Sequence, residues 1–369
     1  MLKENTVVPL VDLQAQYVAI HDEINDAIQT VLNRMDFIQG KEVGIFEEEF
    51  AAFSGNEYAV ACNSGTDALS LACRALDIGP GDEVIMPAFT FVATALGVSL
   101  NGSTPVFVDV EPANALIDST RIAERITPKT KAIIPVHLYG QCVDMRPITR
   151  IANEHGLFVI EDAAQAHGAS FAGHPAGSFG DIGCFSFYPG KNLGAYGDGG
   201  MVTTGSEILA ARLRVLGNLG SQVKYQHVEI GINSRLDTLQ AAILRVKLRY
   251  LEDWNNLRKS LAKSYDQALG TIEGIDLTDV SSDSVYHLYV IRVNNRDEIQ
   301  KRFHEAGIFA GVHYPFAVHE LKAYQNLGYK PGDFPVSEDW ARRCISLPIY
   351  PEMPVETIER SAEILRSAI

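Results

Sequence analysis

The sequence predicts an α/β fold in which helices cover a mostly parallel sheet, followed by a smaller C-terminal α+β domain. Three observations support this prediction. Short apolar runs, typical of strands buried on both faces, alternate with segments of helical spacing up to residue 233. Turn signals such as the Gly-Pro-Gly-Asp segment at 79–82 separate these runs. Beyond residue 233 the alternation gives way to a long helical pattern.

The elements of the first part follow in order along the chain. Apolar residues at helical spacing predict a helix over 17–34, and a second helix is predicted over 43–53. Short runs of apolar residues between turn signals predict seven strands, at 58–61, 83–86, 105–108, 132–135, 157–160, 182–186 and 201–203. Helical patterns lie between most of these strands, for example at 67–76, 90–100 and 145–155.

The C-terminal part has a different pattern. Residues 234–269 carry apolar residues at heptad-like spacing and contain no glycine or proline, which predicts one long helix ending at Gly270. A strand over 286–293 and a helix over 296–306 follow. A chain of 369 residues exceeds the usual size of one domain. We therefore predict a large domain over 1–245 and a small domain over 246–369.

Composition excludes several classes of function. The chain has 46 acidic and 31 basic residues, a net charge of −15, which makes nucleic acid an unfavourable partner. No apolar stretch is long enough to span a membrane, and the N-terminus lacks the pattern of a secretion signal. The five cysteines form no CxxC pair, so we expect reduced, buried thiols and a cytoplasmic location. We predict no metal site.

The first candidate binding motif is Asn-Ser-Gly-Thr-Asp-Ala at 63–68, between a predicted strand and a predicted helix. Gly65 lets an anion approach the backbone, Ser64 and Thr66 offer hydroxyls, and the helix N-terminus offers free N–H groups. These features are typical of a phosphate site. The same residues also fit an ordinary helix start with Ser64 or Thr66 as its N-cap.

The second motif is Glu-Asp-Ala-Ala-Gln-Ala-His at 161–167, directly after the strand predicted at 157–160. Ligands of open parallel sheets bind at the carboxyl ends of strands. Asp162 is placed there to pair with a protonated heterocyclic nitrogen, and Gln165 to hydrogen-bond a phenolic oxygen. Asp162 also fits a helix N-cap, and His167 fits a core histidine better than a catalytic one.

The third motif is the aromatic and glycine-rich segment at 185–200, which contains a single lysine, Lys191. Apolar neighbours solvate an ammonium group poorly, so the pKa of Lys191 is expected to fall and its amine to form a Schiff base readily. Ser186 lies five residues before it and adds a possible phosphate contact.

Together, the phosphate cradle, the carboxylate at a strand end and the activated lysine fit one cofactor, pyridoxal 5′-phosphate (PLP). PLP needs an acidic partner for its ring nitrogen, an amine for its aldehyde and a helix N-terminus for its phosphate. Phe89 and Phe91, at another predicted strand end, are each placed to stack on the ring, and each also fits a core position.

The chain resembles the DegT/StrS-type nucleotide-sugar aminotransferases, which have the aspartate-aminotransferase-like fold (PLP fold type I). The resemblance extends nearly end to end. It rests on NSGTDAL (63–69), PGDEVIMPAFTF (80–91), IPVHLYGQ (134–141), EDAAQAHGA (161–169), FSFYPGKNLGAYGDGG (185–200) and NSRLDTLQAAIL (233–244).

The resemblance implies a role for each matching residue. Lys191 would hold PLP covalently and move protons, and Asp162 would keep the pyridine nitrogen protonated. Cofactor contacts are implied for Gly65, Thr66, Phe91, Gln165 and Ser186, and for Asn233 from the neighbouring subunit of a homodimer with shared active sites. Substrate contacts are implied for Tyr188, Tyr225, His313, Tyr314 and His319, with Lys224 beside them.

The lysine segment is similar to that of enzymes that aminate position 3 of a hexose, closest to dTDP-3-oxo-6-deoxyhexose 3-aminotransferases. The resemblance therefore implies amino transfer from L-glutamate to a nucleotide-linked 3-oxo sugar. UDP-linked 3-oxo uronic acids and 4-oxo sugars are alternative substrates. A PLP sugar dehydratase is disfavoured because such relatives replace the lysine with histidine, and a non-catalytic regulator because Lys191, Asp162 and Gln165 are all present.

Overall fold

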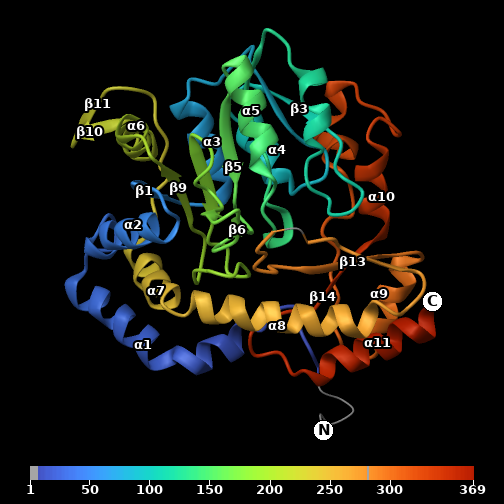
Figure 1. The fold of residues 1–369 in the computed structure, drawn as a ribbon. Helices are drawn as coiled ribbons and strands as arrows, with labels where there is room; N and C mark the ends of the chain where they lie inside the picture. Colours follow the sequence, from blue (N-terminus) through green and yellow to red (C-terminus); the bar gives the residue numbers. More distant parts are fainter. Residues whose placement is uncertain (1–6, 281) are drawn as a thin grey trace.

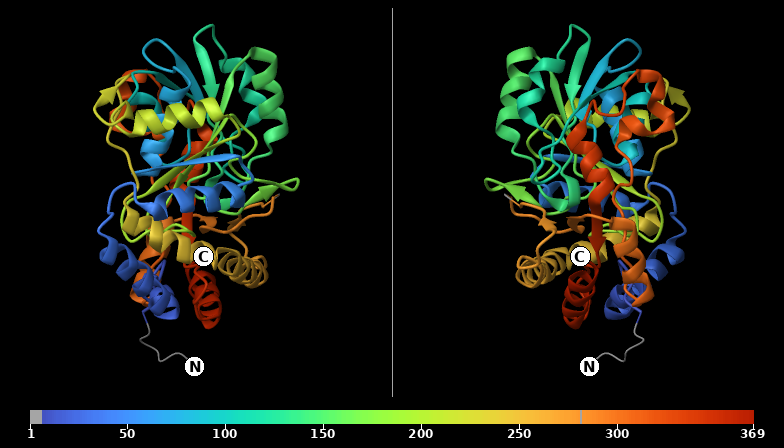
Figure 2. Two further views of the ribbon diagram at one scale, coloured as in Figure 1. Left: turned by 90° about the vertical axis from the view of Figure 1, so that its left-hand side faces the viewer. Right: turned by 90° about the vertical axis from the view of Figure 1, so that its right-hand side faces the viewer.

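In the computed structural model of the chain, residues 7–280 and 282–369 are described. They form a large part around a seven-stranded sheet and a smaller part around a three-stranded sheet (Figure 1). In the side views of Figure 2, the helices α8 (Leu251–Leu269) and α11 (Glu356–Ala368) of the smaller part lie together below the large sheet. The predicted fold class is confirmed.

The large sheet has the strand order β1-β9-β8-β5-β4-β2-β3. Neighbouring strands from β8 through β3 run parallel, whereas β9 is antiparallel to both β1 and β8. The strands are β1 Tyr58–Cys62, β2 Glu83–Pro87, β3 Thr104–Val108, β4 Thr130–Ile133, β5 Phe158–Asp162, β8 Ile182–Ser186 and β9 Gly200–Thr204. Each predicted strand is found within two residues of its predicted ends.

Helices cover both faces of this sheet. On β2, Val84 and Met86 pack in the cluster that includes α3, α4 and α6, whereas Ile85 packs in the cluster that includes α5. Side chains of a strand alternate between faces, so burial of both faces explains the nearly continuous apolar runs. The helices of the large part are α1 Leu13–Arg34, α2 Lys41–Phe53, α3 Gly65–Ala75, α4 Val92–Ser99, α5 Met145–His155, α6 Glu207–Gly217 and α7 Thr238–Leu248.

The smaller part has its own core. Its antiparallel sheet packs Ile291, Ile345 and Leu347 against Tyr265 of α8 and Phe303 of α9, all of them buried. Its elements besides α8 and α11 are β12 Ile275–Leu277, β13 Tyr289–Val293, α9 Arg296–Glu305, α10 Pro335–Arg343 and β14 Cys344–Leu347. The predicted strand at 286–293 is shorter than expected: β13 begins at Tyr289, after a left-handed backbone conformation at Tyr286, with φ of 44°, and a bend at 287–288.

The prediction of one helix over 234–269 is wrong. The chain forms α7 and then α8, with a break at Arg249 and Tyr250 (Figure 1). Tyr250 stacks on Trp254 with the ring centroids 5.7 Å apart, and its hydroxyl hydrogen-bonds Glu23 of α1, which also pairs with Arg249. Contacts with α1 thus accompany a break that no glycine or proline marks. The predicted domain boundary at 245/246 falls inside α7 and stays a prediction.

Short elements complete the chain. The hairpin of β10 (Ser221–Val223) and β11 (Gln226–His227) projects at the edge of the large part in Figure 1. A second hairpin pairs β6 (Ser170–Phe171) with β7 (His174–Pro175). The 3₁₀ turns are η1 Ser119–Arg121, η2 Ala123–Arg125, η3 Leu138–Gly140, η4 Val318–Glu320 and η5 Lys322–Leu327.

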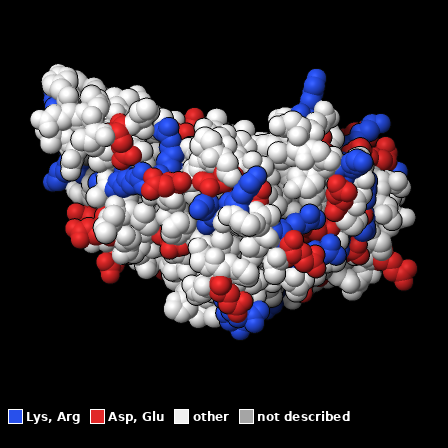
Figure 3. All heavy atoms as spheres, turned by 90° about the horizontal axis from the view of Figure 1, so that it is seen from above, with Lys and Arg blue, Asp and Glu red and all other residues white. Residues whose placement is uncertain are grey.

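Surface and core agree with the composition. Acidic and basic side chains are interspersed on the face shown in Figure 3. All five cysteines are buried and free of disulfides, as predicted. Among the described residues, no helix has both the length and the apolar character that crossing a bilayer requires.

A buried carboxylate fastens the smaller part to the large sheet. Asp109 follows β3 and is 2% exposed. Its oxygens accept hydrogen bonds from the backbone N–H groups of Val336 and Ser337 and from the Ser337 hydroxyl, at 3.1, 2.8 and 2.7 Å. Asp109 thereby caps α10, whose own N-cap residue, Phe334, provides no side-chain hydrogen bond.

We expect Asp109→Ala to lower the free energy of unfolding by about 2–4 kcal/mol, because it leaves buried donors at the start of α10 without an acceptor. Urea denaturation of the purified protein measures this change. Asp253→Ala, at an exposed position of α8, is the matched control and should change stability by less than about 0.5 kcal/mol. Equal stability of the two variants would contradict the capping role.

Candidate active site

A cavity of about 530 Å³ lies where the parallel strands of the large sheet end. Asp162 is the last residue of β5 and Ser186 the last of β8, while the start of α3 follows β1. Ten of the predicted site residues line this cavity: Gly65, Thr66, Phe91, Asp162, Gln165, Ser186, Tyr188, Lys191, His313 and Tyr314.

One wall of the cavity is the first turn of α3. Ser64 caps this helix by accepting a hydrogen bond from the backbone N–H of Asp67 at 3.1 Å. A Cβ added at Gly65 would lie only 2.6 Å from the Cβ of Ser186, so only glycine fits at this position. The interpretation of residues 63–68 as a capped helix start is thus confirmed for Ser64, and the helix start also faces the cavity with Thr66, where a phosphate site stays a prediction.

The carboxylate of Asp162 is held by two donors. The Thr94 hydroxyl donates to Oδ2 at 2.7 Å, and the backbone N–H of Ala164 donates to Oδ1 at 3.2 Å. Burial raises the pKa of Asp162, while the Thr94 hydrogen bond and the charge of Lys191 oppose that rise. The chain after Asp162 forms turns and no helix, so the alternative that Asp162 is a helix N-cap is wrong.

Gln165 is held on both sides of its amide. Its Oε1 accepts from the backbone N–H of Tyr139 at 2.7 Å, and its Nε2 donates to the hydroxyl of Tyr314 at 2.9 Å. Phe91 is half exposed and lies with its ring centroid 5.3 Å from that of Tyr314. Phe89 is fully buried in the core, so Phe91 is the aromatic residue of this segment that faces the cavity.

Lys191 lies on a compact loop after β8. Backbone hydrogen bonds from Lys191 to Tyr188 and from Ala195 to Phe187, each 2.8 Å, shape this loop. Burial lowers the pKa of Lys191 to about 8, and the charge of Asp162 acts in the opposite direction. The amine is therefore far more available as a nucleophile near neutral pH than that of an ordinary lysine.

Two segments of the chain contribute the remaining predicted residues that line the cavity. Tyr188, on the Lys191 loop, is 60% exposed at the cavity. His313 enters from the segment before η4, with Nδ1 2.8 Å from the hydroxyl oxygen of Ser346, and burial lowers its pKa to about 4. Tyr314 follows it, and burial raises its pKa.

Three predicted residues lie elsewhere. Asn233 is exposed, and Tyr225 is 83% exposed in the turn between β10 and β11, beside Lys224. His319 is 3% exposed, with Nε2 3.3 Å from Glu338 and its ring against Phe334, so it is packed inside the protein rather than in the cavity wall. His167 is also buried, between Phe185 and Phe187, as the core interpretation predicts.

Sequence reasoning missed other residues of the site. Thr94 and Thr90 form a chain of hydroxyls, 2.9 Å apart, that ends on Asp162. Thr90, His287 and Asp198 line the cavity. The spacing of two threonines four residues apart at a helix start was an available signal, whereas a lone histidine before a strand carries none.

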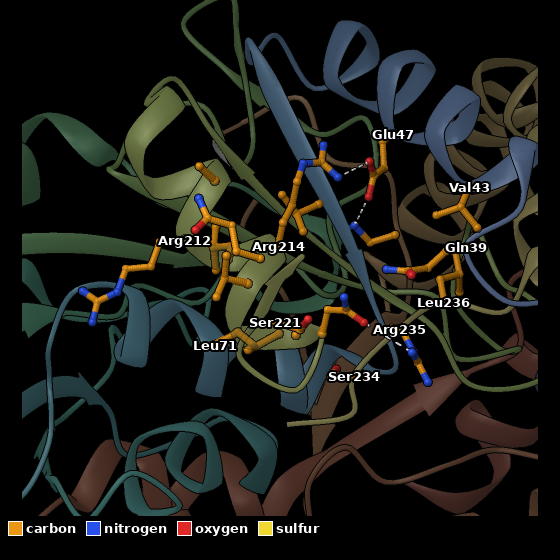
Figure 4. A pocket seen from close by; sticks show the side chains of 18 of the residues that line it. Gln39, Val43, Glu47, Leu71, Arg212, Arg214, Ser221, Ser234, Arg235 and Leu236 are labelled. Atoms are coloured by element: carbon orange, nitrogen blue, oxygen red, sulfur yellow. Dashed lines mark hydrogen bonds and ion pairs between the residues drawn. The ribbon is translucent and has the colours of Figure 1, made fainter. Parts of the chain in front are cut away.

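A second hollow, of about 690 Å³, lies beside α6 and contains none of the predicted catalytic residues (Figure 4). Arg214 pairs there with Glu47 at 2.5 Å, and Glu47 also accepts from the backbone N–H of Ala61. Arg235, two residues after the exposed Asn233, donates to Asn218 at 3.3 Å on the rim of this hollow. This hollow is a feature of the surface around Asn233, separate from the cavity.

The cavity fits PLP. It offers a helix N-terminus with room for an anion beside Gly65, a buried carboxylate at Asp162 and an amine of lowered pKa at Lys191. Among the described residues, no group of three or more His, Cys, Asp or Glu side chains is placed to hold a metal ion. Fold and cavity together define a PLP-dependent enzyme of the aminotransferase class.

Comparisons with known proteins agree. The DegT/DnrJ/EryC1/StrS aminotransferase family matches residues 18–366, and the chain belongs to this family. It is 46% identical to dTDP-3-amino-3,4,6-trideoxy-alpha-D-glucose transaminase of Streptomyces venezuelae, over 95% of this chain and 93% of the relative. It is also 46% identical to UDP-N-acetyl-3-dehydro-alpha-D-glucosamine 3-aminotransferase of Acidithiobacillus ferrooxidans, over the full length of both.

A solved structure is similar as well. The crystal structure of DesV of S. venezuelae in complex with a ketimine intermediate superimposes with a TM-score of 0.96, at 44% identity and 98% coverage of both chains.

Proposed function

We propose that this aminotransferase moves an amino group from L-glutamate to the 3-oxo carbon of a dTDP-3-oxo-6-deoxyhexose, in the cytoplasm. The products are a dTDP-3-amino-3,6-dideoxyhexose and 2-oxoglutarate. The main observation that supports the proposal is that Lys191, Asp162 and the start of α3 line the same cavity. The five free, buried thiols support the location.

The residues of the chain have separate tasks. We propose that Lys191 binds PLP covalently and that its amine, once released, removes and returns the proton at the reacting carbon. Asp162 holds a negative charge at the ring nitrogen, and Gln165 holds the ring hydroxyl through the Nε2 that Tyr314 also uses. When bound, PLP supplies an electron sink for the charge that develops at that carbon.

The choice of sugar rests on the relatives. One is named as a dTDP-sugar transaminase and another as a UDP-sugar 3-aminotransferase, both acting on amino groups at position 3. The lysine segment supports position 3 in this chain as well. A UDP-linked 3-oxo sugar is the second candidate, because its named relative matches the entire chain.

The visible absorption spectrum tests this proposal. The purified protein should show the band of lysine-linked PLP, and L-glutamate should abolish that band. A dTDP-linked 3-oxo-6-deoxyhexose should restore it, and a UDP-linked 3-oxo sugar should restore it more slowly. Absence of a band after PLP is supplied would refute the enzyme proposal, and a band unaffected by L-glutamate would refute the donor.

We propose further that two copies share their active sites. Asn233 is exposed and lies outside the cavity of its own chain, beside the second hollow. Large apolar side chains are exposed at Val228 and Ile230, shortly before it in the chain, and at Ile38, which forms a β-bridge with Asp237; their exposed fractions are 62%, 86% and 50%. Such a surface is typical of an interface. Light scattering should give a molar mass of twice 40.4 kDa.

The lowered pKa of Lys191 predicts how cofactor loading depends on pH. Only the neutral amine attacks the aldehyde, so the rate at which apoprotein regains its visible band should rise with pH up to about 8 and then level off. N-α-acetyl-lysine, with an ordinary pKa of about 10.4, should still gain in rate at pH 10. Parallel profiles for protein and model amine would contradict the assignment of Lys191.

A further inference from the structure

His287 lies in the wall of the cavity, and the chemistry described so far does not use it. It is 8% exposed, and it precedes β13. Its Nδ1 is 3.2 Å from Oδ1 of Asn192, the residue that follows Lys191. The side chain therefore connects the Lys191 loop with the start of the smaller sheet.

The hydrogen bonds of Asn192 determine which of these two atoms donates. Asn192 Nδ2 is 3.0 Å from the carbonyl oxygen of Val285 and 2.9 Å from Oδ1 of Asn255. A carbonyl oxygen only accepts, so the Asn192 nitrogen faces Val285 and its oxygen faces His287. Asn255 is oriented in the same way, because its Nδ2 donates to the carbonyl of His167 at 2.9 Å.

The proton on the ring of His287 is therefore at Nδ1. Burial and the nearby charge of Lys191 lower the pKa of His287, so the ring is neutral. A neutral imidazole protonated at Nδ1 has a free lone pair at Nε2. Within residues 7–280 and 282–369, no protein group donates a hydrogen bond to this nitrogen.

We propose that Nε2 of His287 accepts a hydrogen bond from a hydroxyl group of the nucleotide-linked sugar. The inference rests on the proposed function. A lone pair attracts an O–H donor and repels the carboxylate oxygens of L-glutamate, so His287 favours the sugar over the amino donor. His313 and Tyr314, which are proposed to contact the sugar, line the same cavity.

Two substitutions test the contributions of the two ring nitrogens of His287 separately. In His287→Asn, the amide nitrogen takes the place of Nδ1 and keeps the bond to Asn192, but the cavity loses its acceptor. In His287→Gln, the longer side chain returns an amide oxygen toward the position of Nε2. His287→Asn tests the lone pair while keeping the buried hydrogen bond to Asn192, and His287→Gln restores the acceptor without that bond.

The probe is dTDP-3-amino-3,6-dideoxygalactose, added to holoenzyme while loss of the visible band is followed. We expect His287→Asn to weaken its apparent affinity about five- to tenfold and to weaken the reaction with L-glutamate less. His287→Gln should recover part of the loss. Equal affinity in wild type and His287→Asn, or an equal loss for L-glutamate, would overturn the proposal.

The tautomer is tested without any reaction. In protein labelled with ¹³C and ¹⁵N at histidine, the signals missing from His287→Asn belong to His287. They should be those of an Nδ1–H imidazole and should stay constant across about pH 6–8. An Nε2–H pattern, or a titration in that range, would overturn the inference while leaving the proposed function in place.

The two failures are distinguishable. Wild type that reacts with neither dTDP- nor UDP-linked 3-amino sugars refutes the proposed function and the sugar contact together. Wild type that reacts with the dTDP-linked sugar, while His287→Asn binds it equally well, refutes only the role of His287.

Discussion

Lys191→Ala is expected to reduce turnover by at least about 10⁴-fold while the protein remains folded. Under the proposed function, the variant loses both the amine that attaches the cofactor and the group that moves the proton, which are two contributions to one reaction. Stability should change little, because no hydrogen bond or ion pair to Nζ of Lys191 is found among the described side chains.

Steady-state turnover with L-glutamate and the oxo sugar measures the loss, and circular dichroism checks the fold. Lys263→Ala removes an exposed lysine of α8 and should keep full turnover. A Lys191→Ala protein that retained more than about one per cent of wild-type turnover would refute the role of this lysine in the reaction.

Asp162→Asn should reduce kcat by about 10²–10³-fold, the usual cost of removing one preorganised electrostatic contact. The substitution preserves shape and keeps an oxygen that accepts from Thr94, but it removes the negative charge. The oxygen that becomes an NH₂ group also loses the hydrogen bond from the Ala164 N–H, so the effect of charge is judged against a variant that loses one hydrogen bond alone.

Thr94→Val is the matched comparison, because it removes a hydrogen bond to Asp162 and leaves the carboxylate in place. We expect it to cost about tenfold or less. Single-turnover rates with L-glutamate measure both variants. Similar losses in Asp162→Asn and Thr94→Val would show that the charge is not what the reaction needs.

Much of the fold and of the candidate site was predictable because the sequence motifs lie at the ends of the predicted strands. Buried parallel strands read as apolar runs, and Asp162 and Ser186 are the last residues of two of them. Because parallel strands end at one edge of a sheet, residues distant in sequence meet there. Gly65 and Lys191 were recognisable from their local surroundings, and both line the cavity.

Other features depend on contacts that a local pattern does not contain. The break between α7 and α8 involves Tyr250 and a side chain of α1 more than two hundred residues away. Whether a histidine packs inside or faces the cavity is likewise decided by tertiary partners. His319 lies beside Glu338 in the interior, whereas His287, with no motif around it, reaches the cavity.

The walls of the cavity are drawn from residues as far apart as Leu10 and Tyr314. During synthesis, a nascent chain therefore has an incomplete pocket until its C-terminal part has emerged and packed against the sheet. A cofactor that binds only the finished pocket stabilises completely folded molecules by mass action and does not stabilise partly folded chains. Occupancy of the pocket by cofactor would thus also record how many chains have finished folding.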